Sequence, residues 1–487
     1  MQSKRDQVQA HLFVMGRLAT GMLRGEPDAA DTPAGRTSRG TVTGLVVAAL
    51  IGLVVTLYGV VVPGGATAWK KPGTLIVVKE SGARYLYLDG SLHPVLNEAS
   101  ARLLAGDQLV VDQVSVKSLA DTPRGAPIGI LGAPDGLPEP AALADEPWFS
   151  CAVTRPGPGA VRAPGLALVI GLTRQGDRLA DSQAVLIAAP DATEYLLWRG
   201  RRLRLDGRNG ARQALGQASV TAYPVTAAFL NSLSAGPDLG APELDGRGNA
   251  GPMLANRPTK VGQLFTGPGG DPYVLTSAGL APLSRMAFEL LRNDQRTQSG
   301  AYGGAAVTPA ALTPADLAAH TAPAPAANAA LAGLAGQGLP ASPPDLLAVP
   351  QGRGVCADLR LTEAAPTTSV ALLDAAAVAG LPPAAQPGVE PGCGGADSIA
   401  VRPGGGALVR ALSGAGVGST LYLVTDGGVK YPLASAAVAK QLGYGAATPV
   451  AVPESLLTLL PSGPSLDPAP LTGATAAPRP SGPACPR

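Results

Sequence analysis

Residues 41–62 read TVTGLVVAALIGLVVTLYGVVV, and this stretch divides the chain into a short head and a long body. It contains no Asp, Glu, Lys, Arg, His, Asn or Gln. A helix rises about 1.5 Å per residue, so a helix of this length crosses a bilayer core of roughly 30 Å. The stretch therefore predicts a transmembrane helix, with the head on one side of the membrane and the body on the other.

A cleaved signal peptide and a buried core helix are the alternatives for such a run. A signal peptide has an apolar core of about 7–15 residues close to the N-terminus, whereas this run is longer and begins after residue 40. Ala66 and Ala68 leave cleavage open, although no clear cleavage site follows the run. A core helix would carry a polar stripe, which this run lacks. We predict an uncleaved anchor.

Charge and cysteine content bear on orientation. The head carries six basic residues: Lys4, Arg5, Arg17, Arg24, Arg36 and Arg39. They favour a cytoplasmic head, although basic residues also follow the anchor, at Lys70, Lys71, Lys79 and Arg84. The four cysteines all follow the anchor, as expected for a body in an oxidising compartment, and none has a short metal-binding spacing. They are Cys151, Cys356, Cys393 and Cys485.

Composition excludes some classes of protein. The net charge of +2 argues against nucleic acid as the main partner. With 63 glycines and 48 prolines among 487 residues, several segments are expected to be loops or linkers, and the length allows more than one domain.

The head predicts an amphipathic helix that ends near Gly25 and Pro27. Its apolar face is formed at helical spacing by Val8, Leu12, Met15, Ala19, Met22 and Leu23. Such a helix beside a membrane lies on the bilayer or docks on a partner protein. A solvated helix whose apolar face packs on itself is less favoured, because the head offers nothing else for it to contact.

The body repeats one pattern of strand, turn, strand and helix. Residues 74–106 and 262–292 align on Tyr85 and Tyr273, and a Leu-x-Pro step follows each, at Leu92–Pro94 and Leu280–Pro282. A third copy at 418–445 has its step at Pro432, and a fourth at 184–216 lacks the proline. We expect Asn97 and Ser435 to cap the helices of their repeats at the N-terminus, and Gly106 and Gly443 to end them. Each unit is too small to bury much apolar surface alone, so it must pair with a neighbour or a central element.

The predicted fold class is a single transmembrane helix followed by an elongated, β-rich α+β body, in which four repeats surround a central β-rich domain. A strand is expected within 108–116, a short helix within 225–234, and a long loop at 308–350. The predicted organisation is a head (1–40), the anchor (41–62), repeat 1 (74–106), a central segment (107–183), repeat 2 (184–216), a connecting segment (217–261), repeat 3 (262–292), a second central segment with an Ala/Pro-rich insert (293–417), repeat 4 (418–445) and a disordered tail (461–487).

Catalytic patterns are absent from the sequence. No Gly-Lys pair exists, so no Walker A loop can form. The three histidines, His11, His93 and His320, are too few and too dispersed for a metal or triad site. The carboxylates Asp238, Glu243 and Asp245 could serve acid–base chemistry, but in a Gly/Pro-rich stretch they are expected to be solvated loop charges. We predict no enzyme activity, no cofactor and no metal.

The chain resembles the EccB family in four features. They are the head, QSKRDQVQAHLFVMGRLATGMLRGEPDAADTP, the anchor, the start of the body, GTLIVVKESGARYLYLDGSLHPVLN, and the cysteines of WFSC…GVC. The members of this family are membrane core subunits of actinobacterial type VII (ESX) secretion systems. The resemblance extends over nearly the whole chain. It implies a cytoplasmic N-terminus, one pass through the cytoplasmic membrane, and a periplasmic body with four repeats around a central domain.

The resemblance also implies a disulfide between Cys151 and Cys356, because the family links two segments of its central region. Cys393 and Cys485 are not accounted for by that pattern: they pair with each other, or one is free.

The predicted function is a structural scaffold subunit that frames the periplasmic side of a protein export path. The implied partners are an FtsK/SpoIIIE-type ATPase, a many-pass membrane subunit, a further membrane subunit, the membrane itself and the cell wall, without nucleic acid. The alternatives are a stand-alone membrane-anchored protein whose repeats bind peptidoglycan, and an envelope hydrolase or nucleotidase.

Overall fold

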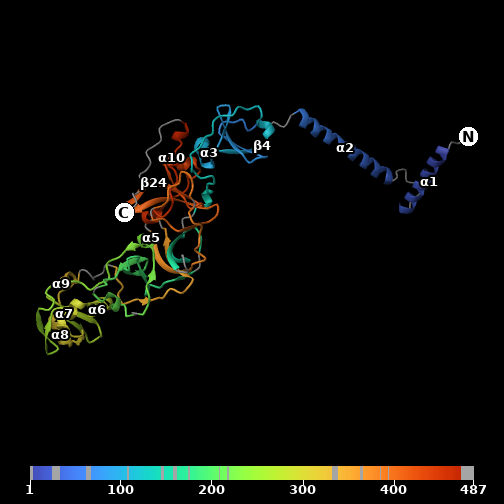
Figure 1. Cartoon of the computed structure of the whole chain (residues 1–487). Coiled ribbons are helices and arrows are strands. Elements are labelled where there is room, and N and C mark those ends of the chain that lie inside the picture. Colours follow the sequence, from blue (N-terminus) through green and yellow to red (C-terminus); the bar gives the residue numbers. More distant parts are fainter. Residues whose placement is uncertain are drawn as a thin grey trace. The chain divides into compact units, whose positions relative to one another are not determined.

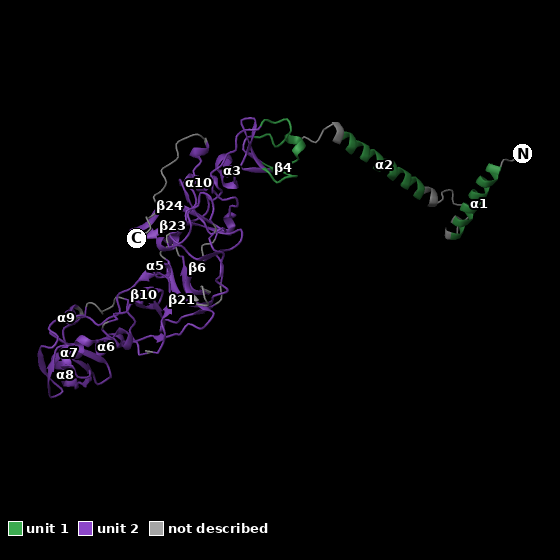
Figure 2. Ribbon diagram, viewed as in Figure 1, with its two compact units in different colours: residues 1–71, 76–83, 112–123 green, residues 72–75, 84–111, 124–487 purple. Residues whose placement is uncertain are grey.

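A computed structural model describes most of the chain (Figure 1). The described residues are 4–24, 33–61, 67–106, 109–143, 147–156, 162–173, 176–207, 209–216, 219–331, 338–361, 366–383, 385–392 and 394–472. Cys393, Cys485, Val62 and residues 473–487 of the predicted tail lie outside these ranges. The chain forms two compact units, which Figure 2 colours separately: residues 1–71, 76–83 and 112–123, and residues 72–75, 84–111 and 124–487.

The first unit contains two long helices, α1 (Lys4–Arg24) and α2 (Pro33–Val61). The helix α2 begins at Pro33, eight residues before the predicted start at Thr41, and proline suits the first turn of a helix. The Thr41 hydroxyl donates to the carbonyl oxygen of Thr37 at 2.8 Å, so this polar side chain is satisfied inside the helix.

All four repeats contain three strands, a helix and a fourth strand. Repeat 1 consists of β1 (Thr74–Val78), β2 (Arg84–Leu88), β3 (Ser91–Pro94), α3 (Glu98–Ala105) and β4 (Val110–Val114). Repeat 2 consists of β8 (Gln183–Ala188), β9 (Glu194–Trp198), β10 (Arg201–Arg204), α4 (Ala211–Ala214) and β11 (Tyr223–Pro224). Repeat 3 consists of β15 (Leu264–Thr266), β16 (Pro272–Thr276), β17 (Gly279–Pro282), α6 (Arg285–Arg292) and β18 (Ala310–Ala311). Repeat 4 consists of β23 (Gly406–Ser413), β24 (Gly416–Thr425), β25 (Lys430–Leu433), α10 (Ala436–Gln441) and β26 (Val450–Pro453).

The predicted strand–turn–strand–helix pattern was therefore incomplete. The Leu-x-Pro step is itself the third strand, and in repeats 2, 3 and 4 the fourth strand returns to pair in parallel with the first. Proline lacks an N–H group, so it is tolerated at the end of this short strand. The caps follow the prediction: Asn97 Oδ1 accepts from the Ser100 N–H at 3.0 Å, and the Ser435 side chain caps α10.

A later segment of the chain covers the outer edge of the third strand in each repeat. We call this segment the strap. Parallel bridges join Leu92 to Arg124, Leu205 to Leu239, Leu280 to Thr321, and Leu433 to Leu466. The strap of repeat 3 comes from the stretch that we expected to be a long loop, and the strap of repeat 4 comes from the tail that we expected to be disordered.

Two of these stretches require correction. Residues 461–472 of the tail that we expected to be disordered are ordered against repeat 4, and Leu466 is fully buried. In the Ala/Pro-rich insert, α8 (Pro314–His320) and α9 (Ala324–Ala330) form. A capping box at Thr313 starts α8, and alanine favours the helical state.

The repeats pair through their helices, as their small size required. Ala99 and Leu103 of α3 share an apolar cluster with Leu442 and Tyr444 after α10. Another cluster joins repeat 2 to repeat 3, where α4 contacts α6. Repeats 1 and 4 therefore form one pair, and repeats 2 and 3 another.

A six-stranded sheet forms the centre of the second unit, with strand order β22-β6-β5-β20-β21-β7. Its strands are β5 (Trp148–Pro156), β6 (Arg162–Ile170), β7 (Gly176–Arg178), β20 (Arg353–Arg360), β21 (Thr367–Asp374) and β22 (Ser398–Val401). One face packs against the largest core, which includes strands of repeats 2 and 4. The predicted fold class, an apolar N-terminal helix followed by a β-rich body, is confirmed.

The remaining elements connect the repeats and the central sheet. They are η2 (Val116–Leu119), η3 (Pro140–Ala142), α5 (Ala227–Ser232), β12 (Ser234–Ala235), β13 (Ala250–Leu254), β14 (Arg257–Lys260), α7 (Gln295–Tyr302), β19 (Asp345–Leu346), α11 (Glu454–Leu457) and η5 (Ala469–Thr472). The expected strand within 108–116 is β4, and the expected helix within 225–234 is α5.

Candidate functional site

The helix α2 presents apolar side chains to its surroundings from Val42 to Tyr58. Residues Thr37–Tyr58 are long and apolar enough to cross a membrane, and none of them is buried by the rest of the chain. It is the only such helix among the described residues. Surfaces of this length and composition are unstable in water and require lipid or other transmembrane helices.

The helix α1 carries an exposed apolar face. Val8, Leu12 and Met15 are 58%, 66% and 54% exposed, and Ala19 is exposed on the same face. Leu23 also lies in α1, with its side chain outside the described part of the structure. The sequence interpretation missed Phe13, which is 68% exposed and lies away from this face. Periodicity selects one stripe of a helix, so apolar residues outside that stripe, such as Phe13 and the adjacent Val14, give no signal.

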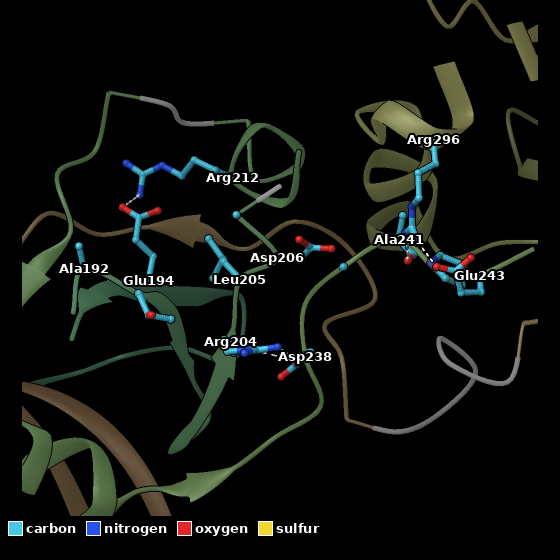
Figure 3. A pocket seen from close by; sticks show the side chains of 14 residues that line it. Ala192, Glu194, Arg204, Leu205, Asp206, Arg212, Asp238, Ala241, Glu243 and Arg296 are labelled. Carbon is cyan, nitrogen blue, oxygen red and sulfur yellow. Dashed lines mark hydrogen bonds and ion pairs between the residues drawn. The ribbon is translucent and has the colours of Figure 1, made fainter. Parts of the chain in front are cut away.

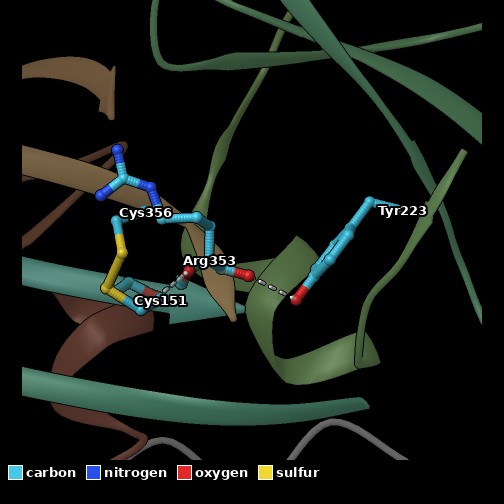
Figure 4. Close-up of a disulfide and its surroundings, with 6 residues drawn as sticks. Cys151, Tyr223, Arg353 and Cys356 are labelled. Carbon is cyan, nitrogen blue, oxygen red and sulfur yellow. Dashed lines mark hydrogen bonds between the residues drawn. A yellow bond between two sulfur atoms is a disulfide. The ribbon is translucent and has the colours of Figure 1, made fainter. Parts of the chain in front are cut away.

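A disulfide joins Cys151 of β5 to Cys356 of β20, which are opposite each other in adjacent antiparallel strands (Figure 4). Both cysteines are fully buried in a small apolar cluster on the second face of the central sheet. The bond connects residues 205 apart in the sequence, so in the chain-entropy view it stabilises the fold by about 4–5 kcal/mol.

A cleft of about 920 Å³ lies between repeat 2 on one side and residues 238–243 with Arg296 of α7 on the other. Figure 3 shows Arg212 with Glu194 on one side of it and Arg296 with Glu243 on the other. Its charged lining residues are Glu194, Arg204, Asp206, Arg212, Asp238, Glu243 and Arg296. Three arginines and four carboxylates thus face one space.

Ion pairs connect most of these side chains. Arg204 donates to Asp238 at 2.8 Å, and this bond raises the pKa of Arg204. Arg212 donates to Glu194 at 2.9 Å, and Arg296 pairs with Glu243. Asp238 and Glu243, which we had interpreted as solvated loop charges, are exposed, and both line the cleft, whereas Asp245 is exposed and lies outside it. The arginines gave no distinctive motif, so sequence reasoning missed the cleft.

The described residues contain no group of three metal-ligating side chains. His11 lies in α1, His93 in β3 and His320 in α8. His93 contacts a backbone carbonyl, with its Nδ1 atom 2.9 Å from the carbonyl oxygen of Ala126.

Comparisons with known proteins give a consistent result. The family model described as type VII secretion system ESX-1, transport TM domain B, matches residues 1–475. The chain is 29% identical to the ESX-3 secretion system ATPase EccB3 of Mycolicibacterium smegmatis, over 95% of this chain and 89% of that protein. It is 28% identical to EccB3 of Mycobacterium tuberculosis strain H37Rv, over 95% of this chain and 88% of that protein.

Solved structures show the same fold. A chain of an intact ESX-5 inner membrane complex superposes with a TM-score of 0.64 at 23% identity, covering 99% of this chain and 98% of that chain. A chain of an EccB3 dimer from the ESX-3 core complex gives 0.63 at 24% identity, covering 83% of this chain and 100% of that chain.

Proposed function

The chain belongs to the EccB family of type VII secretion systems, and we propose that it is a single-pass scaffold subunit of a secretion complex in the cytoplasmic membrane. In this function the anchor packs among other transmembrane helices, the head binds partner subunits, and the body frames the periplasmic side of the export path. The observation that carries the proposal is the apolar surface of α2, which the described chain leaves uncovered.

The proposed partners follow from the family. Its relatives include chains of an ESX-5 inner membrane complex and of an ESX-3 core complex. For this chain we propose an FtsK/SpoIIIE-type ATPase, a many-pass membrane subunit and a further membrane subunit as partners. The exposed apolar face of α1 supports a protein contact in the head.

The proposed orientation places the head in the cytoplasm and the body in the periplasm. The basic residues of the head support it through the positive-inside rule. The Cys151–Cys356 disulfide supports it as well, because disulfides persist in oxidising compartments. Protease added to spheroplasts is expected to digest the body and leave the head attached to the membrane.

The proposed function involves no catalysis by this chain, although the relatives carry the name ATPase. The absence of any Gly-Lys pair from the sequence supports this, because a P-loop needs that lysine to bind phosphates. Purified full-length chain is expected to release no phosphate from ATP above the rate of a mock purification. Phosphate release that stays with the chain through successive purification steps would contradict the proposal.

The scaffold function is tested by extracting the tagged full-length chain from its native membrane in mild detergent. Native electrophoresis and mass spectrometry are expected to find it in a large assembly with the ATPase and the many-pass subunit. A lone monomer or small homo-oligomer, with those subunits elsewhere, would favour a stand-alone envelope-binding protein.

A variant of the head sharpens this experiment. Leu12→Asp with Met15→Asp places two charges on the exposed apolar face of α1. The variant is expected to insert in the membrane but to lose partner subunits. Gln7→Asp with Gln9→Asp adds the same charge away from the centre of that face and is the matched control.

A further inference from the structure

We propose that the cleft between repeat 2 and Arg296 of α7 binds a short peptide that carries both an ammonium and a carboxylate group. The cleft volume of about 920 Å³ falls within the roughly 300–1,000 Å³ of clefts that take small organic ligands. None of its described lining residues is aromatic, so a ligand that binds by ring stacking is not favoured.

Repeat 2 departs from the other repeats at this cleft. In repeats 1, 3 and 4 a tyrosine of the second strand lies opposite the proline of the third: Tyr85 opposite Pro94, Tyr273 opposite Pro282, and Tyr422 opposite Pro432. In repeat 2 the corresponding Tyr195 lies opposite Arg204, which lines the cleft. Repeat 2 therefore has a charged side chain at the position where the other three repeats have proline.

The two arginines on the walls are held by backbone carbonyls. Arg212 donates to the carbonyl oxygen of Val220, and Arg296 donates to that of Ala241 at 2.9 Å. Arg296 is further fixed by Asp294, whose Oδ1 atom lies 3.2 Å from its Nε atom. These bonds hold each guanidinium group in place even when the partner of its other N–H groups changes. A guanidinium group is planar and can donate two parallel hydrogen bonds to a carboxylate.

The partner of Arg296 in the cleft is easily replaced. The side chain of Glu243 is 81% exposed, and exposed ion pairs contribute little to stability because both charges are well solvated. A ligand carboxylate can therefore take the place of Glu243 on Arg296 at small cost. The bond exchange conserves charge, since one carboxylate leaves the arginine as another arrives.

The carboxylates of the cleft favour a cation in the same ligand. Asp206 and Asp238 both face the cleft (Figure 3). An ammonium group near these aspartates is stabilised by opposite charge. A short peptide with free termini carries both groups and fits the distribution of charge.

The experiment is calorimetric titration of the purified full-length chain with the tripeptide Ala-Ala-Ala, with both of its ends free. Its N-acetylated and C-amidated forms each remove one charge. We expect the free tripeptide to bind and both blocked forms to bind less tightly. Arg296→Gln is expected to lose binding of the free tripeptide.

The decisive variant is Glu243→Gln. It removes the carboxylate that competes for Arg296, so it is expected to tighten tripeptide binding by up to about fivefold, the range that corresponds to an exposed ion pair. Its side chain is mostly exposed, so folding is preserved. Glu289→Gln makes the same change in the partly exposed pair with Arg292 outside the cleft and is the control, expected to leave binding unchanged.

Three results would overturn the proposal: no binding of the free tripeptide, equal binding of the blocked forms, or an affinity that Glu243→Gln leaves unchanged or weakens. Peptide binding is measured on the isolated chain and does not depend on the membrane assembly. A chain that binds no peptide would therefore not contradict the scaffold function, and a chain found outside the assembly would not contradict the peptide site.

Discussion

The carboxylate of Asp294 is fully buried and satisfied by four donors at the start of α7. It accepts from Arg247 at 2.6 Å, from Arg296 at 3.2 Å, and from the N–H and hydroxyl of Thr297 at 3.0 and 2.9 Å. One residue thus caps a helix and fixes two arginines from different parts of the chain. Removing the charge of Asp294 is therefore expected to affect both arginines and the first turn of α7.

Asp294→Asn is expected to destabilise repeat 3 by about 3 kcal/mol, because it leaves two arginines without their buried partner. The measurement is amide hydrogen exchange in α7, together with the melting temperature of the full chain. Asp245→Asn neutralises an exposed carboxylate of the same connecting segment and should change neither. Equal exchange in α7 for the two variants would show that the buried pair contributes nothing.

Lys430 links pH to the stability of repeat 4. Its Nζ atom donates to the carbonyl oxygen of Leu460 at 2.7 Å, and burial lowers the pKa of Lys430 to about 8. The unfolded chain keeps this lysine charged up to its ordinary pKa of 10.5. Between pH 8 and pH 10.5 the unfolded state binds more protons than the folded state. The free energy of unfolding therefore rises as the pH rises through this range, and the gain is lost again as the pH falls back to about 8.

Lys430→Met is expected to remove this rise, so the melting temperature of the variant should gain less than that of the wild type between pH 8 and pH 10. The comparison ends at pH 10 because burial raises the pKa of Tyr431 to about 12. Above its ordinary pKa of 10 this tyrosine lowers the stability of the folded state as the pH rises. Lys440→Met, at an exposed position in α10, is the control. Identical pH profiles for the two variants would refute the assignment.

At the scale of the element, α2 carries a stripe of small residues on one face. Gly40, Gly44, Ala48 and Gly52 recur every four residues. A Cβ atom added at any of these glycines would meet no atom within 4 Å outside the backbone of the helix. Small residues at this spacing let transmembrane helices approach closely.

Gly44→Leu is therefore expected to reduce the fraction of chain found in the large membrane assembly, because the leucine side chain separates α2 from a neighbouring helix. The measurement is native electrophoresis after mild-detergent extraction, with total membrane content as the reference. Val46→Leu enlarges a side chain on the opposite face of α2 and should leave the assembly intact. An unchanged assembly with Gly44→Leu would show that this face contacts lipid.

At the scale of the whole molecule, the straps connect distant parts of the sequence. The last strap binds β25 through Lys430 N–H to the Pro461 carbonyl oxygen at 2.9 Å and through Leu466 N–H to the Pro432 carbonyl oxygen at 2.8 Å. It also buries Leu466 completely. The end of the described chain is thus part of repeat 4.

Deletion of residues 461–487 is expected to destabilise repeat 4, since burial of Leu466 alone contributes about 2 kcal/mol and β25 loses its edge partner. Deletion of residues 473–487 keeps the strap and is the matched control. Limited proteolysis should cleave repeat 4 faster in the longer deletion only. Equal cleavage of both would show that the strap does not stabilise the repeat.

The sequence by itself determined the long apolar helix, the four repeats, the helix caps and the resemblance to the EccB family. The apolar helix, the repeats and the caps each depend on a signal that is local in the chain: an uncharged apolar run, two strands joined by a turn, or a side chain that caps the next turn of helix. Asn97 and Ser435 were predictable because the groups that they bind lie three residues away.

Tertiary structure alone decided the straps, the pairing of repeats 1 with 4 and 2 with 3, and the cleft. These contacts join residues far apart in sequence, such as Arg296 and Glu243, which are 53 positions apart. Residues 308–350 and 461–487 were not expected to contain straps, because a strap pairs with a distant strand and its own sequence carries no strand or helix pattern. Which charges meet depends on how the repeats pack, and packing is a property of the whole unit.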